Sequence, residues 1–453
     1  MAEALSVYEL LSAHFENQFR ETALSYFGRR FSRGQLLSRT DRCARGFLAR
    51  GVRSGQPVLL CAPSVPETVI ALLALWRLGA VPHLLNPAFS PELLALRIRQ
   101  SDGKILLVLD KLWPRVREAA NTAGVKDIIL IPASGSLPFF VRRAARKASP
   151  PEDFGGFHGI SWRVFLRNNT RGPIPTPSVS PQDTAAVVYP SGSNELLGGI
   201  ELTHGGITAM AAAYEASPFR PTKGGRFLDM IPPWFATGLT AALLVPLCLG
   251  QEVALQPSFR PKAFAAALLR DRPNYVVASD SLWREALDRP ELDKADLSFL
   301  LSPYTGIANE PLSPADENAV NAFFRAHGSP AKLGRAFGLC ELGGTVSATG
   351  ADDSLPGSVG IPLPGIAVSA FDPASGVPLP RGETGELWVD SPCRMKGYFG
   401  NPEATRRFFS PDEAGILWAR TGYAGFVSQN GSVFVTGRMP RVSSCRQEFP
   451  VIK

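Results

Sequence analysis

Three short apolar runs separated by stretches of helical character constrain the fold of this sequence most. The runs are 58–61 (VLLC), 105–109 (ILLVL) and 128–131 (IILI), and the first is followed by an apolar helical stretch at 66–78. Continuous runs of this length are typical of strands buried on both faces. Because strands that alternate with helices form parallel sheets covered by helices, the pattern predicts an α/β protein.

The size and composition of the chain suit a cytoplasmic protein of more than one subdomain. Its 453 residues, 45% of them hydrophobic, exceed what one compact core fills, so we expect two or three subdomains. A net charge of +7 is spread over mixed acidic and basic residues, which does not favour nucleic-acid binding. No apolar stretch is long enough to predict a transmembrane segment, and the N-terminus lacks the basic start of a signal peptide.

The segment 139–147 (FFVRRAARK) joins two aromatic residues to four basic ones. One interpretation is weak peripheral contact with an anionic membrane surface. The other is a solvated helix face that precedes a loop. The following residues, 148–181, are rich in Pro, Gly and Ser, which predicts a linker or a long surface loop.

A turn rich in Ser and Gly follows the apolar run 184–188 and precedes a second apolar stretch. It lies within 189–204, YPSGSNELLGGIELTH. Glycines let the backbone approach a ligand closely, while amide and hydroxyl groups donate hydrogen bonds to phosphate oxygens. The turn is therefore a candidate polyphosphate site, although it lacks the Gly-Lys-Ser/Thr of a Walker A loop.

Residues 189–204 resemble the phosphate loop of the adenylate-forming superfamily, which includes the acyl-CoA synthetases. That loop usually reads Tyr-Thr-Ser-Gly-Thr-Thr-Gly-x-Pro-Lys-Gly-Val-x-x-Thr-His. The positions that match in register are Tyr189, Ser191, Gly192, Gly199, Thr203 and His204. Those that differ are Pro190, Ser193, Asn194, Glu195, Leu197 and Gly198.

The resemblance implies that Ser191, Gly192 and Ser193 hold the phosphates of ATP and that His204 belongs to the catalytic set. In the family, a lysine at the position of Gly198 adds positive charge, whereas Glu195 here adds negative charge. Loss of one preorganised charge-stabilising group typically costs about a hundred- to a thousandfold in rate. The loop therefore predicts poor ATP-dependent catalysis.

A second resemblance covers 334–341, GRAFGLCE, which is similar to the family's Asn/Gln-Gly-Tyr-Gly-x-Thr-Glu. It implies that Phe337 stacks on adenine beside Gly338, and that Glu341 acts in catalysis and holds Mg²⁺. Cys340 replaces the hydroxyl that would face the α-phosphate. Without the resemblance, Glu341 would be read as a residue at a helix start.

Further segments resemble the borders of the substrate and ribose sites. Phe235 occupies the histidine position of the family's Pro-x-Phe-His segment, and Ile307 stands at a pocket glycine, so both would form apolar walls. Phe235 is equally interpreted as part of a packed aromatic turn. Tyr423 replaces the aspartate that binds both ribose hydroxyls, while Arg438 remains to reach the ribose.

The resemblance also implies the domain plan. Two stacked parallel-sheet subdomains with flanking helices and a small β-rich, barrel-like part, 357–438, would form an AMP-binding domain over 1–438. Residues 439–453 would be the hinge and a remnant of the C-terminal lid domain, whose catalytic lysine is absent. A separate lid domain or a carrier protein would then be a partner.

Three functions remain open, and whether the chain is an active enzyme is uncertain from its sequence. The first is an acid–thiol or acyl-AMP ligase that converts a carboxylic (fatty) acid and MgATP to acyl-AMP and pyrophosphate. The second is a pseudoenzyme that binds a nucleotide or acyl ligand, or that acts as a scaffold for a partner. The third is a decaying coding sequence without selected activity.

Overall fold

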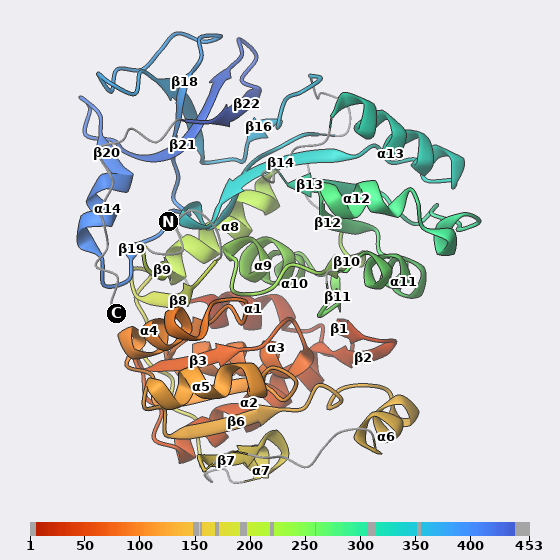
Figure 1. The fold of residues 1–453 in the computed structure, drawn as a ribbon, viewed down its shortest axis with the longest axis vertical. Helices are drawn as coiled ribbons and strands as arrows, with labels where there is room; N and C mark the ends of the chain where they lie inside the picture. The colour runs from red at the N-terminus through yellow and green to blue at the C-terminus, as the bar shows by residue number, and fades with distance from the viewer. Residues whose placement is uncertain are drawn as a thin grey trace.

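The fold is a stack of sheets and helices with a smaller sheet at one end (Figure 1). The computed structural model describes residues 6–147, 154, 156–167, 172–190, 197–217, 222–258, 260–306, 313–350 and 355–439. Two of its sheets are mainly parallel and the third is antiparallel. This confirms the predicted α/β class with a small β-rich part.

The first parallel sheet forms the lower half of Figure 1. Within the described residues its strand order is β19-β9-β8-β4-β3-β5-β6-β7, and β8 to β7 run parallel. The strands are β3 (Pro57–Cys61), β4 (Val81–Leu84), β5 (Ile105–Leu109), β6 (Asp127–Ile131), β7 (His158–Ser161), β8 (Thr184–Val188), β9 (Ile200–Thr203) and β19 (Gly397–Tyr398). Every residue of β5 is buried, which explains its unbroken apolar sequence.

The second parallel sheet has the order β16-β15-β14-β13-β12-β10-β11-β1-β2 in the described part of the chain. Its strands are β1 (Thr22–Tyr26), β2 (Arg29–Ser32), β10 (Arg226–Asp229), β11 (Glu252–Leu255), β12 (Tyr275–Ser279), β13 (Ser302–Gly306), β14 (Gly334–Leu339), β15 (Gly344–Ala348) and β16 (Ile361–Pro362). The antiparallel hairpin β1–β2 closes one edge, and β14–β15–β16 closes the other.

Helices fill the space between the two parallel sheets and cover their outer faces. The inner layer includes α1 (Val7–Phe15), α2 (Arg33–Ala49), α3 (Pro66–Arg77), α8 (His204–Ala216), α9 (Ala236–Leu239), the π-helical turn η1 (Thr240–Leu244) and α10 (Val245–Cys248). The outer helices are α4 (Pro91–Ser101), α5 (Trp113–Thr122), α11 (Pro261–Asp271), α12 (Asp280–Ala286) and α13 (Pro314–Ala326). Residues from both sheets and the inner helices share the largest buried cluster, so the two sheets form one packed body.

The small antiparallel sheet follows in sequence and lies at the top of Figure 1. It contains β17 (Ala367–Phe371), β18 (Gly385–Asp390), β20 (Phe409–Pro411), β21 (Leu417–Val427) and β22 (Val433–Arg438). Three further short helices are the 3-10 turns η2 (Pro290–Leu292) and η3 (Cys340–Leu342), and α14 (Pro402–Phe408). Because η3 directly follows β14, the edge of the second sheet leads into the candidate site.

The prediction of a linker or loop over 148–181 is wrong for part of that range. β7 extends the first sheet there, and α7 (Trp162–Arg167) follows it with Trp162 and Phe165 buried. The aromatic ring of Phe165 packs edge-on against Phe47 of α2. Among the described helices, none combines the length and apolar character that crossing a bilayer requires.

Candidate active site

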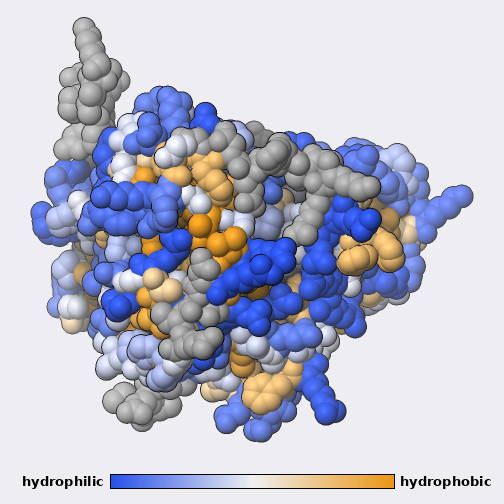
Figure 2. Space-filling model, turned by 90° about the horizontal axis from the view of Figure 1, so that it is seen from below, coloured by the Kyte–Doolittle hydropathy of each residue, from blue (hydrophilic) through white to orange (hydrophobic). Residues whose placement is uncertain are grey.

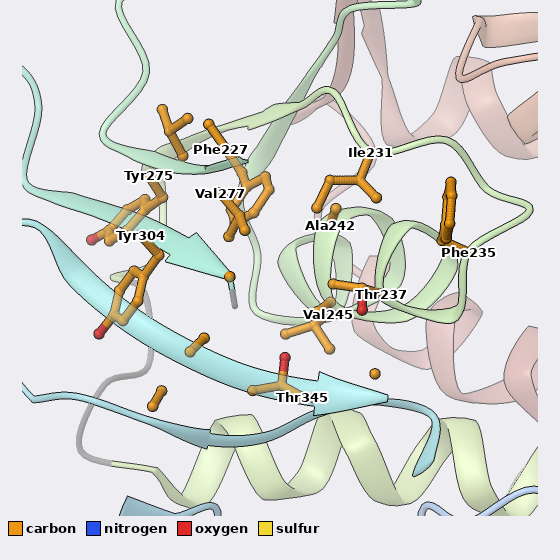
Figure 3. Close-up of a pocket in the computed structure, with 18 of the residues that line it drawn as sticks. Phe227, Ile231, Phe235, Thr237, Ala242, Val245, Tyr275, Val277, Tyr304 and Thr345 are labelled. Carbon is orange, nitrogen blue, oxygen red and sulfur yellow. The ribbon is translucent and has the colours of Figure 1, made fainter. Parts of the chain in front are cut away.

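A large apolar cavity lies between the second sheet and the helical run α9–η1–α10 (Figure 3). It has a volume of about 520 Å³, and its walls include Phe227, Ile231, Ala242, Val245, Tyr275 and Val277. The parallel strands β10, β12 and β13 line the cavity along one face, from residues at their amino ends, such as Tyr275 and Ser302, to Gly306 at the carboxyl end of β13. The π-helical turn supplies Ala241 and Ala242, whose small side chains leave the space open.

The polar groups of the cavity are largely engaged with the protein itself. The Tyr214 hydroxyl donates to Thr345 Oγ1 at 2.9 Å, and the Tyr304 hydroxyl donates to the carbonyl oxygen of Thr349 at 2.7 Å. Burial raises the pKa of Tyr214 to about 12, so its hydroxyl stays protonated at neutral pH. Among the described residues that line the cavity there is no charged side chain. The cavity therefore suits an apolar group.

Phe337 and Gly338 of β14 form one wall of this cavity, next to the antiparallel strands that close the second sheet. A bulge between β14 and β15 falls at these two residues. A Cβ atom added at Gly338 would lie 2.0 Å from the carbonyl oxygen of Gly344, so only glycine allows the two strands to approach this closely. Phe337 is buried, and its ring meets the ring of Tyr423 edge-on at a centroid distance of 5.2 Å.

Glu341 lies in η3, directly after Cys340, which lines the cavity. Its side chain is buried and accepts a hydrogen bond from the Tyr398 hydroxyl at 2.9 Å, measured to Oε1. Its backbone carbonyl accepts from the N–H of Met395 at 2.7 Å. Burial and the nearby Glu341 carboxylate raise the pKa of Tyr398, which keeps this phenol a donor. The carboxylate is thus held in a fixed orientation next to the cavity wall.

Cys340 stands where the resemblance places a hydroxyl. The N–H of Ala236, at the start of α9, points at its sulfur with an N–S distance of 3.4 Å. Burial raises the pKa of the Cys340 thiol to about 12, so the thiol is neutral at physiological pH. A neutral thiol is a weak donor, and it stabilises a phosphate oxygen less than a hydroxyl does.

His204 is not among the residues that line the cavity. It begins α8, and its Nδ1 accepts a hydrogen bond from the backbone N–H of Val7 at 3.2 Å. Burial lowers the pKa of His204 to about 4, which keeps the imidazole neutral and able to accept. The structure therefore places His204 in the contact between α1 and α8.

The predicted phosphate-binding residues Ser191, Gly192 and Ser193 lie outside the described residues, as do Glu195 and Ile307. The loop is described again from Leu197, whose carbonyl accepts a hydrogen bond from the Asn401 side chain at 2.8 Å. Gly198, at the position of the family's lysine, has a φ of +132°. A Cβ atom there would lie 2.9 Å from the carbonyl oxygen of Phe399. A residue with a side chain is therefore disfavoured at this position.

Arg438 lies at the end of β22, opposite Tyr423 of β21. The Arg438 side chain is directed at Tyr423, which stands at the position of the family's ribose-binding aspartate. Together with Phe337, these residues form a continuous line of contacts from the cavity wall to the exposed edge of the small sheet.

Phe235 borders a second cavity as well as the first. The second cavity, of about 580 Å³, lies at the carboxyl ends of strands from both parallel sheets and includes Asn86, Leu109 and Trp234 in its walls. Both cavities are lined by Ile231, Phe235 and the segment 277–279. In Figure 3, Phe235 stands at one end of the first cavity, and Tyr275 and Tyr304 stand at the other. No sequence signal indicated the second cavity, because its walls come from distant segments.

The described residues provide only part of a binding site for a divalent cation. Among the residues that the structure describes, no three His, Cys, Asp or Glu side chains gather as a metal site. Mg²⁺ commonly binds through one or two carboxylates together with waters and substrate phosphates. Glu341 fits the role of a single carboxylate ligand of that kind. For the nucleotide the fit is also partial, because Tyr423 lacks the bidentate acceptor that two ribose hydroxyls need.

Comparison with known proteins defines the class. The AMP-binding enzyme family matches residues 11–399, which is most of the chain. The chain therefore belongs to the AMP-binding enzyme family. Enzymes of this family form adenylates and generally use ATP and Mg²⁺.

Individual relatives are acid–CoA ligases. A long-chain-fatty-acid–CoA ligase of Bacillus subtilis is 25% identical over 428 residues, covering 92% of this chain and 74% of the relative. 4-Coumarate–CoA ligase 4 of Arabidopsis thaliana is 26% identical over 420 residues, covering 90% and 69%. The crystal structure of a long-chain-fatty-acid–CoA ligase from Archaeoglobus fulgidus has a TM-score of 0.81 at 19% identity, covering 96% of this chain and 85% of that one. The solved structure shares the fold of this chain, and the two ligases are relatives to which its sequence is similar.

Proposed function

We propose that this protein binds an apolar carboxylic acid in the large cavity with an adenine nucleotide beside it, and that it forms acyl adenylate only slowly. The observation that carries the proposal is the shared wall of Phe337, Gly338 and Cys340, which bounds the cavity and leads directly into Glu341. An acid seated in the cavity would present its carboxylate at the point where the nucleotide-binding segment begins.

The walls of the cavity support an apolar acid in particular. Aliphatic and aromatic side chains dominate, and the described lining contains no cation to pair with a second carboxylate. A fatty acid or an aromatic acid fits such a surface, since each buried methylene contributes about 0.8 kcal/mol. A dicarboxylic acid does not fit, because its inner carboxylate would be buried without a partner.

The roles of the remaining residues follow from the resemblance. Phe337, Gly338 and Arg438 would contact the nucleoside, Ser191, Gly192 and Ser193 the phosphates, and Glu341 the Mg²⁺ ion. The overall reaction would convert the acid and MgATP to acyl-AMP and pyrophosphate. A separate lid domain or a carrier protein would be a further partner in this reaction.

A second candidate is a pseudoenzyme that binds an acyl ligand or a nucleotide without turnover, or that acts as a scaffold for a partner. Gly198 and Tyr423 favour it. Both replace charged residues of the family, and the backbone at Gly198 leaves little room for a side chain. Binding and turnover must therefore be measured separately.

Calorimetric titration of the purified chain with saturated fatty acids and with ATP tests binding, and pyrophosphate release tests turnover. Gly306 offers a variant that fills the cavity, because it lines the cavity and, within the described part of the chain, nothing lies within 4 Å of a Cβ added there. Gly306→Leu should weaken acid binding by more than tenfold, while Gly306→Ala should change it little. Equal binding by both variants, or no binding of any apolar acid by the wild type, would contradict the proposal.

A further inference from the structure

Helix α6 (Phe139–Lys147) is not explained by the candidate active site. In Figure 1 it stands at the periphery, beyond the end of the first sheet and away from α9 and α10, which border the large cavity. Helices on the surface of a soluble protein normally turn their apolar face toward the core. In α6 the apolar residues at the start of the helix face solvent instead.

Three consecutive apolar side chains are exposed at the beginning of α6. Phe139 is 60% exposed, Phe140 is 83% exposed and Val141 is 52% exposed. The two phenyl rings contact each other edge-on at 5.5 Å, so they form one projecting apolar group. The underside of the molecule, where α6 lies with β7 and α7, carries hydrophobic residues in patches on a largely hydrophilic surface (Figure 2). Contiguous exposed apolar side chains that carry no structural role point to an interaction site.

Basic residues follow the apolar group directly. The guanidinium of Arg142 lies 5.8 Å from the centroid of the Phe139 ring, and Arg143 is exposed beside it. The sequence of the helix, FFVRRAARK, contains four basic residues and no acidic one. A partner for this surface must therefore offer an apolar phase next to negative charge.

An anionic lipid bilayer meets both requirements at once. Aromatic and aliphatic side chains insert below the headgroups, while arginines remain at the phosphate level. Nine residues of helix extend only about 13 Å, which is too short to cross a bilayer but sufficient to lie in its interface. A stable protein–protein contact usually buries roughly 1,000 Å² or more, far beyond what one short helix end provides.

We propose that α6 docks this protein on membranes that contain anionic lipids, with Phe139, Phe140 and Val141 inserted and Arg142 and Arg143 at the headgroup phosphates. The docking surface is distinct from the candidate active site, so it is independent of whether the chain turns over ATP. The net charge of the whole protein, +7, assists its approach to a negatively charged membrane surface.

Vesicle co-sedimentation tests this proposal with the full chain. The protein should sediment with vesicles of phosphatidylcholine and phosphatidylglycerol, remain in solution with phosphatidylcholine alone, and be released from the anionic vesicles by high salt. Arg142→Gln/Arg143→Gln should reduce partitioning about 25-fold, since each basic residue near the surface contributes roughly a fivefold factor. Phe139→Ser/Phe140→Ser should abolish binding even at low salt.

Phe19→Ser/Arg20→Gln is the matched control, because Phe19 is also exposed and is followed by an exposed arginine, but it lies outside α6. This control should bind vesicles as the wild type does, and thermal unfolding should show that all three variants remain folded. Three results would overturn the proposal: no binding of the wild type to anionic vesicles, equal binding to neutral ones, or an equal loss in the control. Self-association that depends on Phe140 without vesicle binding would also overturn it and would assign α6 to a protein contact.

Discussion

Arg438 contacts Tyr423 in two ways, because its Nη2 donates a hydrogen bond to the Tyr423 hydroxyl at 2.9 Å and its guanidinium carbon lies 4.9 Å from the centroid of the ring. The same ring meets Phe337 edge-on. By resemblance, all three positions face the nucleoside. Tyr423 therefore links the residue expected at adenine to the residue expected at ribose, and it takes up the hydrogen-bonding capacity of one arginine N–H.

Restoring a carboxylate at this position should strengthen nucleotide binding. Tyr423→Asp removes the ring contacts and supplies an acceptor for both ribose hydroxyls. Hydrogen bonds to a charged group contribute about 1.5–3 kcal/mol, so we expect ATP to bind roughly ten- to a hundredfold more tightly. Calorimetric titration with ATP and Mg²⁺ measures the change.

Tyr423→Phe is the control for the loss of the hydroxyl. It keeps the ring against Phe337 and against the Arg438 guanidinium, and it removes only the hydroxyl that accepts the hydrogen bond from Arg438. ATP affinity should stay at the level of the wild type. If Tyr423→Asp binds ATP no better than Tyr423→Phe, the nucleoside does not lie against this strand.

Replacing Gly198 with lysine should not restore catalysis. Its φ of +132° is unfavourable for residues with a side chain, and the carbonyl of Phe399 blocks the Cβ position. We expect Gly198→Ala and Gly198→Lys each to lower the free energy of unfolding by about 1–3 kcal/mol. Pyrophosphate release by Gly198→Lys should not exceed that of the wild type.

Urea denaturation of Gly198→Ala beside Gly306→Ala separates this backbone effect from a general cost of adding a methyl group. Gly306 has no positive φ, and no atom of the described residues lies within 4 Å of its Cβ position. Its alanine variant should therefore have an unfolding free energy within about 0.5 kcal/mol of the wild type, or slightly above it. Equal effects at the two glycines would mean that the loop near Gly198 adapts freely.

The sequence predicted the sheets well because their strands are buried. β5 has the bounds that its apolar run indicated, since all five of its residues are buried. β7 was missed because its residues are half-buried or exposed at the edge of the sheet, which leaves no apolar run to detect. The π-helical turn η1 was also missed, since an alanine- and leucine-rich segment reads as ordinary helix.

The candidate site was only partly predictable, because its geometry depends on contacts between distant segments. The motif containing Phe337 and Glu341 could be found from local sequence. The hydrogen bond between Glu341 and Tyr398 joins residues 57 positions apart in the sequence, so no local sequence pattern predicts it. The environment of His204 could not be predicted from local sequence either. Its motif suggested a catalytic role, whereas in the structure its Nδ1 accepts a hydrogen bond from a backbone N–H almost 200 residues away.

Asp229, at the end of β10, should make stability depend on pH. Burial raises the pKa of this carboxyl well above its usual range, which outweighs the lowering effect of the Ser64 hydroxyl and the Ile231 N–H. Because the pKa of Asp229 is higher in the folded state than in the unfolded state, proton binding stabilises the folded protein. This stabilisation is complete when the pH is below the unfolded-state pKa of about 4, and it is lost as the pH rises toward the folded-state pKa. The loss from one carboxyl is at most about 1.4 kcal/mol per pH unit.

Asp229→Asn removes this titration while keeping the shape of the side chain. The variant should gain stability relative to the wild type as pH rises from 5 to 8 (a window of about three units) in urea denaturation. Asp288→Asn, at an exposed position, serves as the control and should leave the pH dependence unchanged. A constant difference between Asp229→Asn and the wild type over this range would show that Asp229 is ionised throughout.

Phe235 should determine which acids the large cavity accepts, because it stands in the wall that the two cavities share. Phe235→Ala would join the cavities and extend the apolar space toward Trp234. Each further methylene that is buried contributes about 0.8 kcal/mol, or roughly a fourfold gain in affinity. The variant should therefore prefer longer saturated acids than the wild type, whereas Phe235→Leu, which keeps most of the wall, should not. Calorimetric titration with a series of acids measures the affinities of the two variants. An equal change in affinity for acids of every chain length would show that Phe235 only packs the turn before α9.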